Sequence, residues 1–178
     1  IDKGKERTLH VLPYFPHRII QWAIILAMQD SLNNLYYDKS YASIKGKGTL
    51  KASKDLRKAL RLHGDTHYLQ RDVAKFYPSV DRDIMMRIIR RKYKDNRLVA
   101  LLSKIVYSAP GRLGLALGSL LSQWLGNLYL TYFDYFVKHV LKVKSYFRYC
   151  DDIVILGSSR IQLNVLRMCI KAYLIANL

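Results

Sequence analysis

Apolar and polar positions follow two different periods along this chain. In residues 17–33 apolar side chains recur three and four positions apart, which predicts a helix with one apolar face. The same spacing, often after a Ser, Thr or Asp that suits an N-terminal cap, predicts further helices. One of them begins after a cap at Thr49 or Ser53 and ends near residue 61, and a second covers 82–92 after a cap at Ser79 or Asp81. Three more cover residues 97–107, 119–139 and 162–176.

Short stretches with strand character lie between these helices. Residues 68–73 predict one strand, and residues 143–156 predict a hairpin with a tight turn at Cys150, Asp151 and Asp152. The basic, alternating residues 7–12 are typical of a further strand or hairpin arm. Together these elements predict an α+β fold, in which helical layers pack on one face of a small antiparallel sheet.

The charge of the chain narrows its partners. The formal net charge is +17, with 30 Lys and Arg against 13 Asp and Glu, and such a surface is typical of a protein that binds a polyanion. Nucleic acid is favoured over an anionic membrane, because no predicted helix is both strongly basic and strongly amphipathic. Cys150 and Cys169 form neither a zinc motif nor a disulfide framework, so we expect a reducing, cytoplasmic location. Ile1 is not an initiator methionine, which suggests a start inside a longer protein.

The predicted hairpin carries two adjacent acids at its tip. Asp151 and Asp152 repel each other, and in a partly buried place they are costly unless a cation neutralises them. Carboxylate oxygens are hard ligands that suit magnesium. The alternative is an ordinary turn, because Asp is favoured in hairpin turns for conformational reasons alone.

Asp72 lies at the end of the other predicted strand. The chain between Asp72 and Asp151 is long enough to fold back and place the two strands side by side. Three carboxylates on neighbouring strands could hold two magnesium ions, which would stabilise the attacking and leaving oxygens of a phosphoryl transfer. The alternative for Asp72 is a helix cap or a surface charge.

Five short motifs follow one another along the chain. They are Gly4-Lys5-Glu6-Arg7, Ser40-Tyr41-Ala42-Ser43 with Gly46-Lys47-Gly48-Thr49, Asp72 followed five positions later by Tyr77, Gly118 with Ser122, and Tyr149-Cys150-Asp151-Asp152. In this order they resemble the motifs of reverse transcriptases, and the resemblance covers essentially the whole chain. The resemblance implies the fingers and palm of a right-hand polymerase. Residues 1–66 would form part of the fingers and residues 67–178 the palm with helical insertions, and the thumb would lie beyond this chain.

The resemblance also implies a two-metal site. Asp72 and Asp151 would be the principal Mg²⁺ ligands, the backbone carbonyl of Val73 would help, and Asp152 would be a secondary ligand. Mn²⁺ is an expected substitute. The implied reaction is RNA-directed DNA synthesis, in which deoxynucleotides are added to the 3′ end of a DNA or RNA primer.

Other residues would contact the deoxynucleoside triphosphate. Tyr77 would be the steric gate that excludes a 2′-hydroxyl, and Arg7, with Lys5, would bind the triphosphate. Leu117 and Gly118 would lie at the nucleotide site. The alternatives are a core aromatic for Tyr77 and a solvated basic arm for Arg7 and Lys5.

One departure from the common family pattern points to a subfamily. Leu117 and Gln123 stand where many reverse transcriptases carry Gln and Pro, and this pattern resembles the reverse transcriptases of diversity-generating retroelements. A Gln there ordinarily supports the nascent base pair, so Leu117 predicts reduced selectivity for the correct base. The alternative is a relaxed position without effect on fidelity.

Basic residues near the end of the predicted helix 82–92 are candidates for contact with template or primer phosphates. With Tyr149, the candidate nucleic-acid contacts are Arg87, Arg90, Arg91 and Lys92. The expected partners are therefore an RNA template, a primer and an accessory RNA-binding protein, without a membrane, in a bacterial or phage-encoded system. Two other readings stay open: a group II intron-type maturase, and a catalytically idle RNA-binding module of the same fold.

Overall fold

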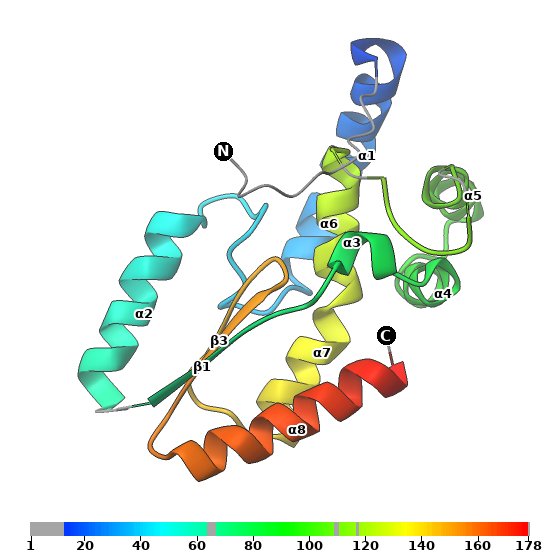
Figure 1. Cartoon of the computed structure of the whole chain (residues 1–178). Coiled ribbons are helices and arrows are strands. Elements are labelled where there is room, and N and C mark those ends of the chain that lie inside the picture. Colours follow the sequence, from blue (N-terminus) through cyan, green and yellow to red (C-terminus); the bar gives the residue numbers. More distant parts are fainter. Residues whose placement is uncertain (1–12, 64–66, 109–110, 117, 178) are drawn as a thin grey trace, which may run out of the picture. The chain divides into compact units, whose positions relative to one another are not determined.

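The computed structural model describes residues 13–63, 67–108, 111–116 and 118–177. The chain divides into two compact units, each built from two stretches of sequence. The first unit comprises Ile1–Asp30 with Tyr77–Leu125, and the second comprises Ser31–Phe76 with Gly126–Leu178. Strands and helices alternate without the simple repeat of a parallel α/β protein, which confirms the predicted α+β class (Figure 1).

The second unit contains a three-stranded antiparallel sheet. Its strands are β1 (His67–Asp72), β2 (Tyr146–Tyr149) and β3 (Asp152–Gly157), in the order β1-β3-β2. The register of β1 and β3 runs from His67 opposite Gly157 to Asp72 opposite Asp152, and β2 places Tyr149 opposite Asp152 as well. The predicted strand and hairpin are therefore confirmed, and both pairings of β3 meet at Asp152.

Helices of the second unit cover this sheet. Helix α8 (Arg160–Asn177) packs on β1 and β3, and Figure 1 shows it beside α7 (Thr131–Tyr135). Tyr173 of α8 stacks on Phe136 with ring centroids 4.2 Å apart and also contacts Phe133, at 5.9 Å. These aromatic contacts fix the α7 region against α8.

Helix α2 (Thr49–His63) packs against β2 through its apolar face. Ala52, Leu56 and Ala59 contact a buried cluster that includes Phe147 of β2. The other faces of α2 carry exposed basic residues, namely Lys51, Lys54, Arg57, Lys58 and Arg61. The expectation that no helix is both basic and amphipathic is therefore wrong. The sheet covers Ala52, Leu56 and Ala59 of α2, whereas Leu50, Leu60 and Leu62 stay exposed.

The first unit holds the turn η1 (Tyr14–Arg18), most of α1 (Ile19–Asn33), and the helices α4 (Arg82–Lys92) and α5 (Asn96–Val106). Helices α4 and α5 are in contact and bury Met85 and Leu102. Asp81 accepts hydrogen bonds from the backbone N–H groups of Asp83 and Ile84, at 2.8 and 2.9 Å, so of the two predicted candidates, Ser79 and Asp81, it is Asp81 that caps α4. The short α3 (Phe76–Ser79) precedes α4.

The predicted helix over 119–139 is interrupted. It consists of α6 (Leu120–Tyr129), α7 and the π-helical turn η2 (Phe136–Val140), with Leu130 between α6 and α7. Leu130 has ψ 0°, and the Thr131 hydroxyl donates to the Asn127 carbonyl at 3.1 Å. A Thr side chain that bonds back one turn competes with the helix ladder and bends it. In the part of the chain that the structure describes, no helix is long and apolar enough to span a bilayer.

Candidate active site

The predicted acids come together at one end of the β1-β3-β2 sheet. Asp72, the last residue of β1, pairs with Asp152, the first residue of β3. Residues directly opposite in an antiparallel pair point to the same face, with Cα atoms about 4.5–5.5 Å apart. The pairing continues one step further, because the Val73 N–H donates to the Asp151 carbonyl at 3.3 Å. Asp72, Val73, Asp151 and Asp152 therefore occupy adjacent backbone positions.

The turn between β2 and β3 has the backbone shape of a tight hairpin. Cys150 and Asp151 form it, and Cys150 has φ +55°, in the left-handed region that side chains other than glycine seldom adopt. The turn lifts Asp151 beyond the end of the sheet, next to the exposed Asp152 and Asp72.

The two adjacent acids disfavour each other electrostatically. Partial burial, and then the charge of Asp151, raise the pKa of the Asp152 carboxyl above its usual value. A raised carboxyl pKa means that the charged form is destabilised in this position. A bound cation would remove that penalty, since it favours the ionised carboxylate.

The ligand chemistry of this corner fits a divalent metal such as Mg²⁺, which prefers carboxylate and carbonyl oxygens. Asp72, Asp151, Asp152 and the Val73 carbonyl would supply those oxygens. Among the residues that the structure describes, no three His, Cys, Asp or Glu side chains converge as a ready-made metal cluster. The backbones of the three acids are already adjacent, so convergence requires only rotation of their side chains.

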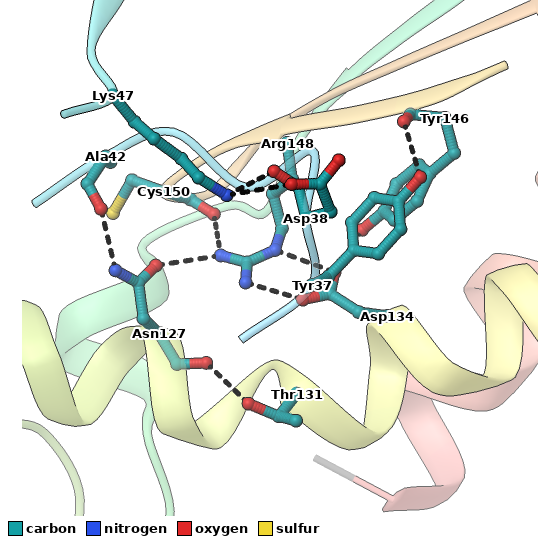
Figure 2. Close-up of polar contacts among 10 residues, drawn as sticks. All are labelled: Tyr37, Asp38, Ala42, Lys47, Asn127, Thr131, Asp134, Tyr146, Arg148 and Cys150. Carbon is teal, nitrogen blue, oxygen red and sulfur yellow. Dashed lines mark hydrogen bonds and ion pairs between the residues drawn. The ribbon is translucent and has the colours of Figure 1, made fainter. Parts of the chain in front are cut away.

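A buried guanidinium lies directly beneath the acidic turn (Figure 2). Arg148 of β2 is fully buried, and its Nη1 donates to the Cys150 carbonyl at 2.9 Å and to Asn127 Oδ1 at 3.0 Å. Its Nε and Nη2 donate to the two carboxylate oxygens of Asp134 at 2.8 and 2.6 Å. This is a bidentate ion pair, the strongest geometry available to arginine.

The partners of Arg148 are themselves held. The Tyr146 hydroxyl donates to Asp134 Oδ1 at 2.5 Å, and Asn127 Nδ2 donates to the Ala42 carbonyl at 2.8 Å. Burial alone would lower the pKa of the Arg148 guanidinium, but the charge and hydrogen bonds of Asp134 outweigh it and raise that pKa. The guanidinium therefore stays charged in a place that water does not reach.

Sequence reasoning missed Arg148, Asp134 and Asn127. A usable signal was present, because Asp134 is the one acid within the largely apolar residues 119–139, and Arg148 interrupts an apolar strand. Charged side chains are almost never fully buried unless they are paired. A lone acid and a lone base in two apolar elements are therefore candidates for a buried pair.

Two of the predicted nucleotide contacts belong to the first unit. Tyr77 is half-buried, and its carbonyl accepts a hydrogen bond from the Leu115 N–H at 2.9 Å. Gly118 is exposed and has φ +88°, which favours glycine. Lys5, Arg7 and Leu117 lie outside the described residues.

The loop that leads toward Gly118 is tied to helix α4. The buried Arg82 donates to the carbonyls of Gly114, Gly111 and Leu113 at 2.6, 2.7 and 3.0 Å. Gly114 has φ +92°, and a Cβ there would meet the Pro78 carbonyl oxygen at 3.1 Å. Arg82 is a further residue that sequence reasoning missed, because a basic residue at a helix start reads as solvated.

The predicted nucleic-acid contacts are on exposed surfaces of both units. Arg87, Arg90, Arg91 and Lys92 are exposed on the last two turns of α4. Arg90, Arg91 and Lys92 lie in its last turn, where positive charge also stabilises the negative end of the helix dipole. Tyr149 of the second unit is 38 % exposed, opposite Asp152. The exposed charges at the end of α4 therefore have a structural explanation as well as the predicted role in binding nucleic acid.

The α+β architecture, a small antiparallel sheet covered by helices, is consistent with the fingers and palm of a right-hand polymerase. A family model described as reverse transcriptase (RNA-dependent DNA polymerase) matches residues 2–177. The chain therefore belongs to the reverse transcriptase family.

One protein and one solved structure are similar to this chain. Protein YkfC of Escherichia coli (strain K12) is 25 % identical over 147 residues, which cover 76 % of this chain and 38 % of that protein. The structure of apo telomerase from Candida tropicalis, truncated from the C-terminal domain, is similar with a TM-score of 0.57 at 12 % identity. That match covers 85 % of this chain and 35 % of the telomerase chain, and at this identity it shows the fold alone. The chain thus spans well under half of either relative.

Proposed function

We propose that this chain contributes the catalytic site of an RNA-directed DNA polymerase that extends a primer with deoxynucleotides. The observation that carries the proposal is the β1–β3 register, which sets Asp72 opposite Asp152 and next to Asp151 in a chain of the reverse transcriptase family. Asp72, Asp151, Asp152 and the Val73 carbonyl would hold two Mg²⁺ ions. When bound, these ions would supply charge stabilisation for the attacking and leaving oxygens of the phosphoryl transfer.

The chain's other residues would bind and select the substrate. Arg7 and Lys5 would hold the triphosphate by charge-assisted hydrogen bonds. The ring of Tyr77 would occupy the space that a 2′-hydroxyl needs, and Gly118 would let the chain approach the nucleotide closely. We assign residues 1–66 to the fingers and 67–178 to the palm, while RNA template, primer and an accessory RNA-binding protein are the proposed partners.

Exposed charge supports a contact with template or primer. Arg87, Arg90, Arg91 and Lys92 would bind phosphates, while Tyr149 would lie at the primer end beside the acids. Phosphate contacts of this kind position the nucleic acid without reading its sequence, and they weaken as salt concentration rises.

Replacing the acids by their amides tests the site. We expect Asp151→Asn or Asp72→Asn to lower Mg²⁺-dependent primer extension on an RNA template by about 10³-fold or more, because several kcal/mol of charge stabilisation is lost. RNA binding should stay within about twofold, since the positive surface is unchanged. Asp30→Asn, a matched change at an exposed acid of α1, should leave extension unaltered. Extension that survives the combined Asp72→Asn and Asp151→Asn change would overturn the assignment, and its absence from the unmodified protein would favour an idle RNA-binding module.

The finer assignment is to an error-prone enzyme of a diversity-generating retroelement. Leu117 beside Gly118, with Gln123 after Ser122, supports it. Leu117→Gln should lower misincorporation opposite template adenines, because an amide restores hydrogen bonds that favour the correct pair. Sequencing of the products checks this, with template guanines as the internal control. An unchanged error spectrum would remove Leu117 from the explanation and return the intron-type maturase to equal standing.

A further inference from the structure

Arg148 reaches the candidate metal turn from below, and this contact extends the proposed function on which it rests. We propose that Arg148 is a positioning residue, which fixes the backbone of the Cys150–Asp151 turn so that rotation of the Asp151 side chain can bring its carboxylate toward Asp72 and Asp152. Arg148 would touch neither metal nor substrate. Its role would be exerted through one hydrogen bond to the Cys150 carbonyl.

Two peptide planes flank Asp151, and each is held by one hydrogen bond. The peptide before Asp151 contains the Cys150 carbonyl, which accepts from Arg148 Nη1 at 2.9 Å. The peptide after it contains the Asp151 carbonyl, which accepts from the Val73 N–H at 3.3 Å. A peptide unit is planar, so one hydrogen bond to each unit restrains the orientation of both. The direction of the Cα–Cβ bond of Asp151 is thereby restrained from both sides.

The guanidinium can serve as a fixed point because two other side chains hold it through three hydrogen bonds. Asp134 binds Nε and Nη2 in a fork, and Asn127 Oδ1 accepts from the same Nη1 that reaches Cys150 (Figure 2). Asp134 belongs to α7 and Asn127 to α6, so Arg148 links the turn to these two helices as well as to the hairpin. Rigid elements hold site residues more accurately than a free loop does.

This turn needs such a restraint for two reasons. Cys150 has φ +55°, which is unfavourable for a residue with a Cβ. Asp151 and Asp152 are also adjacent acids, and the repulsion between like charges favours any backbone movement that separates them. An unrestrained turn would relax away from the arrangement in which three carboxylates can share a cation.

Arg148→Lys tests the restraint because lysine keeps the positive charge but lacks the planar fork. One ammonium cannot bind both oxygens of Asp134 and also reach the Cys150 carbonyl in the same geometry. We expect Mn²⁺ affinity, measured by electron paramagnetic resonance on the purified chain, to fall by about 10–100-fold, as for residues that orient metal ligands. The Mg²⁺ concentration that gives half-maximal primer extension should rise by a similar factor, and excess Mg²⁺ should partly restore the rate.

Tyr146→Phe is the matched control. It also removes a hydrogen bond to Asp134, but Tyr146 has no contact with the Cys150 carbonyl among the described interactions. We expect a lower melting temperature with Mn²⁺ affinity within about twofold of wild type. If Tyr146→Phe and Arg148→Lys weaken metal binding equally, the Arg148 network is a stabilising core feature only, and the positioning role is wrong.

A combined variant separates folding from positioning in case Arg148→Lys fails to fold. Tyr146→Phe, Asp134→Leu and Arg148→Met together replace the buried polar cluster by apolar side chains, a change that often preserves stability. We expect a folded protein whose Mn²⁺ affinity is still reduced by about tenfold or more, because the Cys150 carbonyl has lost its donor. Wild-type Mn²⁺ affinity in this variant would overturn the positioning role. Failure of the wild-type chain to bind Mn²⁺ at all would instead overturn the proposed function.

Discussion

Among the residues that the structure describes, two arginines are almost completely buried, one in each unit, and both bind main-chain carbonyls of a turn. Arg148, 0 % exposed, donates to the Cys150 carbonyl beside the candidate metal ligands. Arg82, 1 % exposed, donates to three carbonyls of the 111–114 loop, which leads toward Gly118. Each of these two turns is therefore held by one buried arginine that belongs to no recognised motif.

The two arginines differ in what their removal leaves behind. The charge of Arg148 faces the carboxylate of Asp134, which is 2 % exposed, so loss of either partner strands a buried charge. The described bonds of Arg82 end on neutral carbonyls, of which those of Gly111 and Leu113 belong to exposed residues. The acidic turn is thus tied to a cluster that cannot adapt, whereas the 111–114 loop can turn toward water. The comparison predicts a graded series of effects.

The largest effect is expected at the buried ion pair. Asp134→Asn should lower the free energy of unfolding by about 3–5 kcal/mol, because it leaves the Arg148 guanidinium buried with a neutral partner. Urea denaturation followed by circular dichroism measures this change. Tyr146→Phe, which removes one neighbouring hydrogen bond, should cost only about 1 kcal/mol. Equal losses for the two variants would mean that the ion pair carries no special weight.

Arg82→Met should have a smaller effect, about 2 kcal/mol. The methionine fills the space of the arginine stem, but three carbonyls lose their donor, and the exposed part of the loop can recover hydrogen bonds from water. The same denaturation experiment measures the loss. Hydrogen exchange at the Gly114 and Leu115 amides should accelerate more than exchange in α5, because the loop loosens locally. A loss as large as that of Asp134→Asn would erase the difference between the two arginines.

Much of the fold follows from local patterns. Helix α4 occurs over the predicted residues with the predicted Asp81 cap, and β1 and the β2–β3 hairpin follow their apolar runs. The break at Leu130 was missed, because it depends on one hydroxyl bonding back to the Asn127 carbonyl. A long apolar run has no signal for such a choice, since either backbone path buries the same side chains.

The candidate site was predictable only in part. Adjacent acids on two strands are visible in a sequence, and the register that joins Asp72 to Asp152 agrees with that expectation. The support beneath them joins β2 to α6 and α7, and the pairing of Arg148 with Asp134 requires the tertiary fold. The roles of Tyr77, Gly118 and the basic end of α4 stay predictions.

The glycine of the Arg82-bound loop refines the comparison at a lower energy. Gly114→Ala should cost about 1–2 kcal/mol, because φ +92° is strained for alanine and the new Cβ would lie 3.1 Å from the Pro78 carbonyl oxygen. Gly111→Ala is the control, since its φ of +82° is similar but, chain neighbours aside, no atom of the described residues lies within 4 Å of the added Cβ. The difference between the two melting temperatures isolates the close approach from the backbone strain. No difference would mean that the Pro78 segment moves aside freely.

The smallest expected effect concerns the electrostatic strain of the acidic turn. Because burial and Asp151 raise the pKa of Asp152 in the folded chain, the folded state binds its proton more tightly than the unfolded state does. Without metal, the stability that the Asp152 proton contributes is fully present below the ordinary carboxyl pKa of about 4. It is lost as the pH rises through the raised pKa of Asp152 in the folded chain. The Asn side chain of the Asp152→Asn variant does not ionise, so the variant avoids this loss of stability. In EDTA at pH 7 it should therefore be more stable than wild type by about a few tenths of a kcal/mol.

Magnesium should reverse this order. A cation that binds the ionised carboxylates stabilises the wild-type chain by mass action, while Asp152→Asn gains less from the same concentration. Melting curves at pH 5 and pH 7, each with EDTA and with Mg²⁺, give the four values needed. The sign change between EDTA and Mg²⁺ at pH 7 distinguishes a metal site from a turn that merely tolerates two acids. A variant that is less stable than wild type under all four conditions would show that Asp152 serves the fold of the turn. The loss of stability at Asp152 would then be of the same kind as the loss at Asp134, and it would no longer rank below the loss at Gly114.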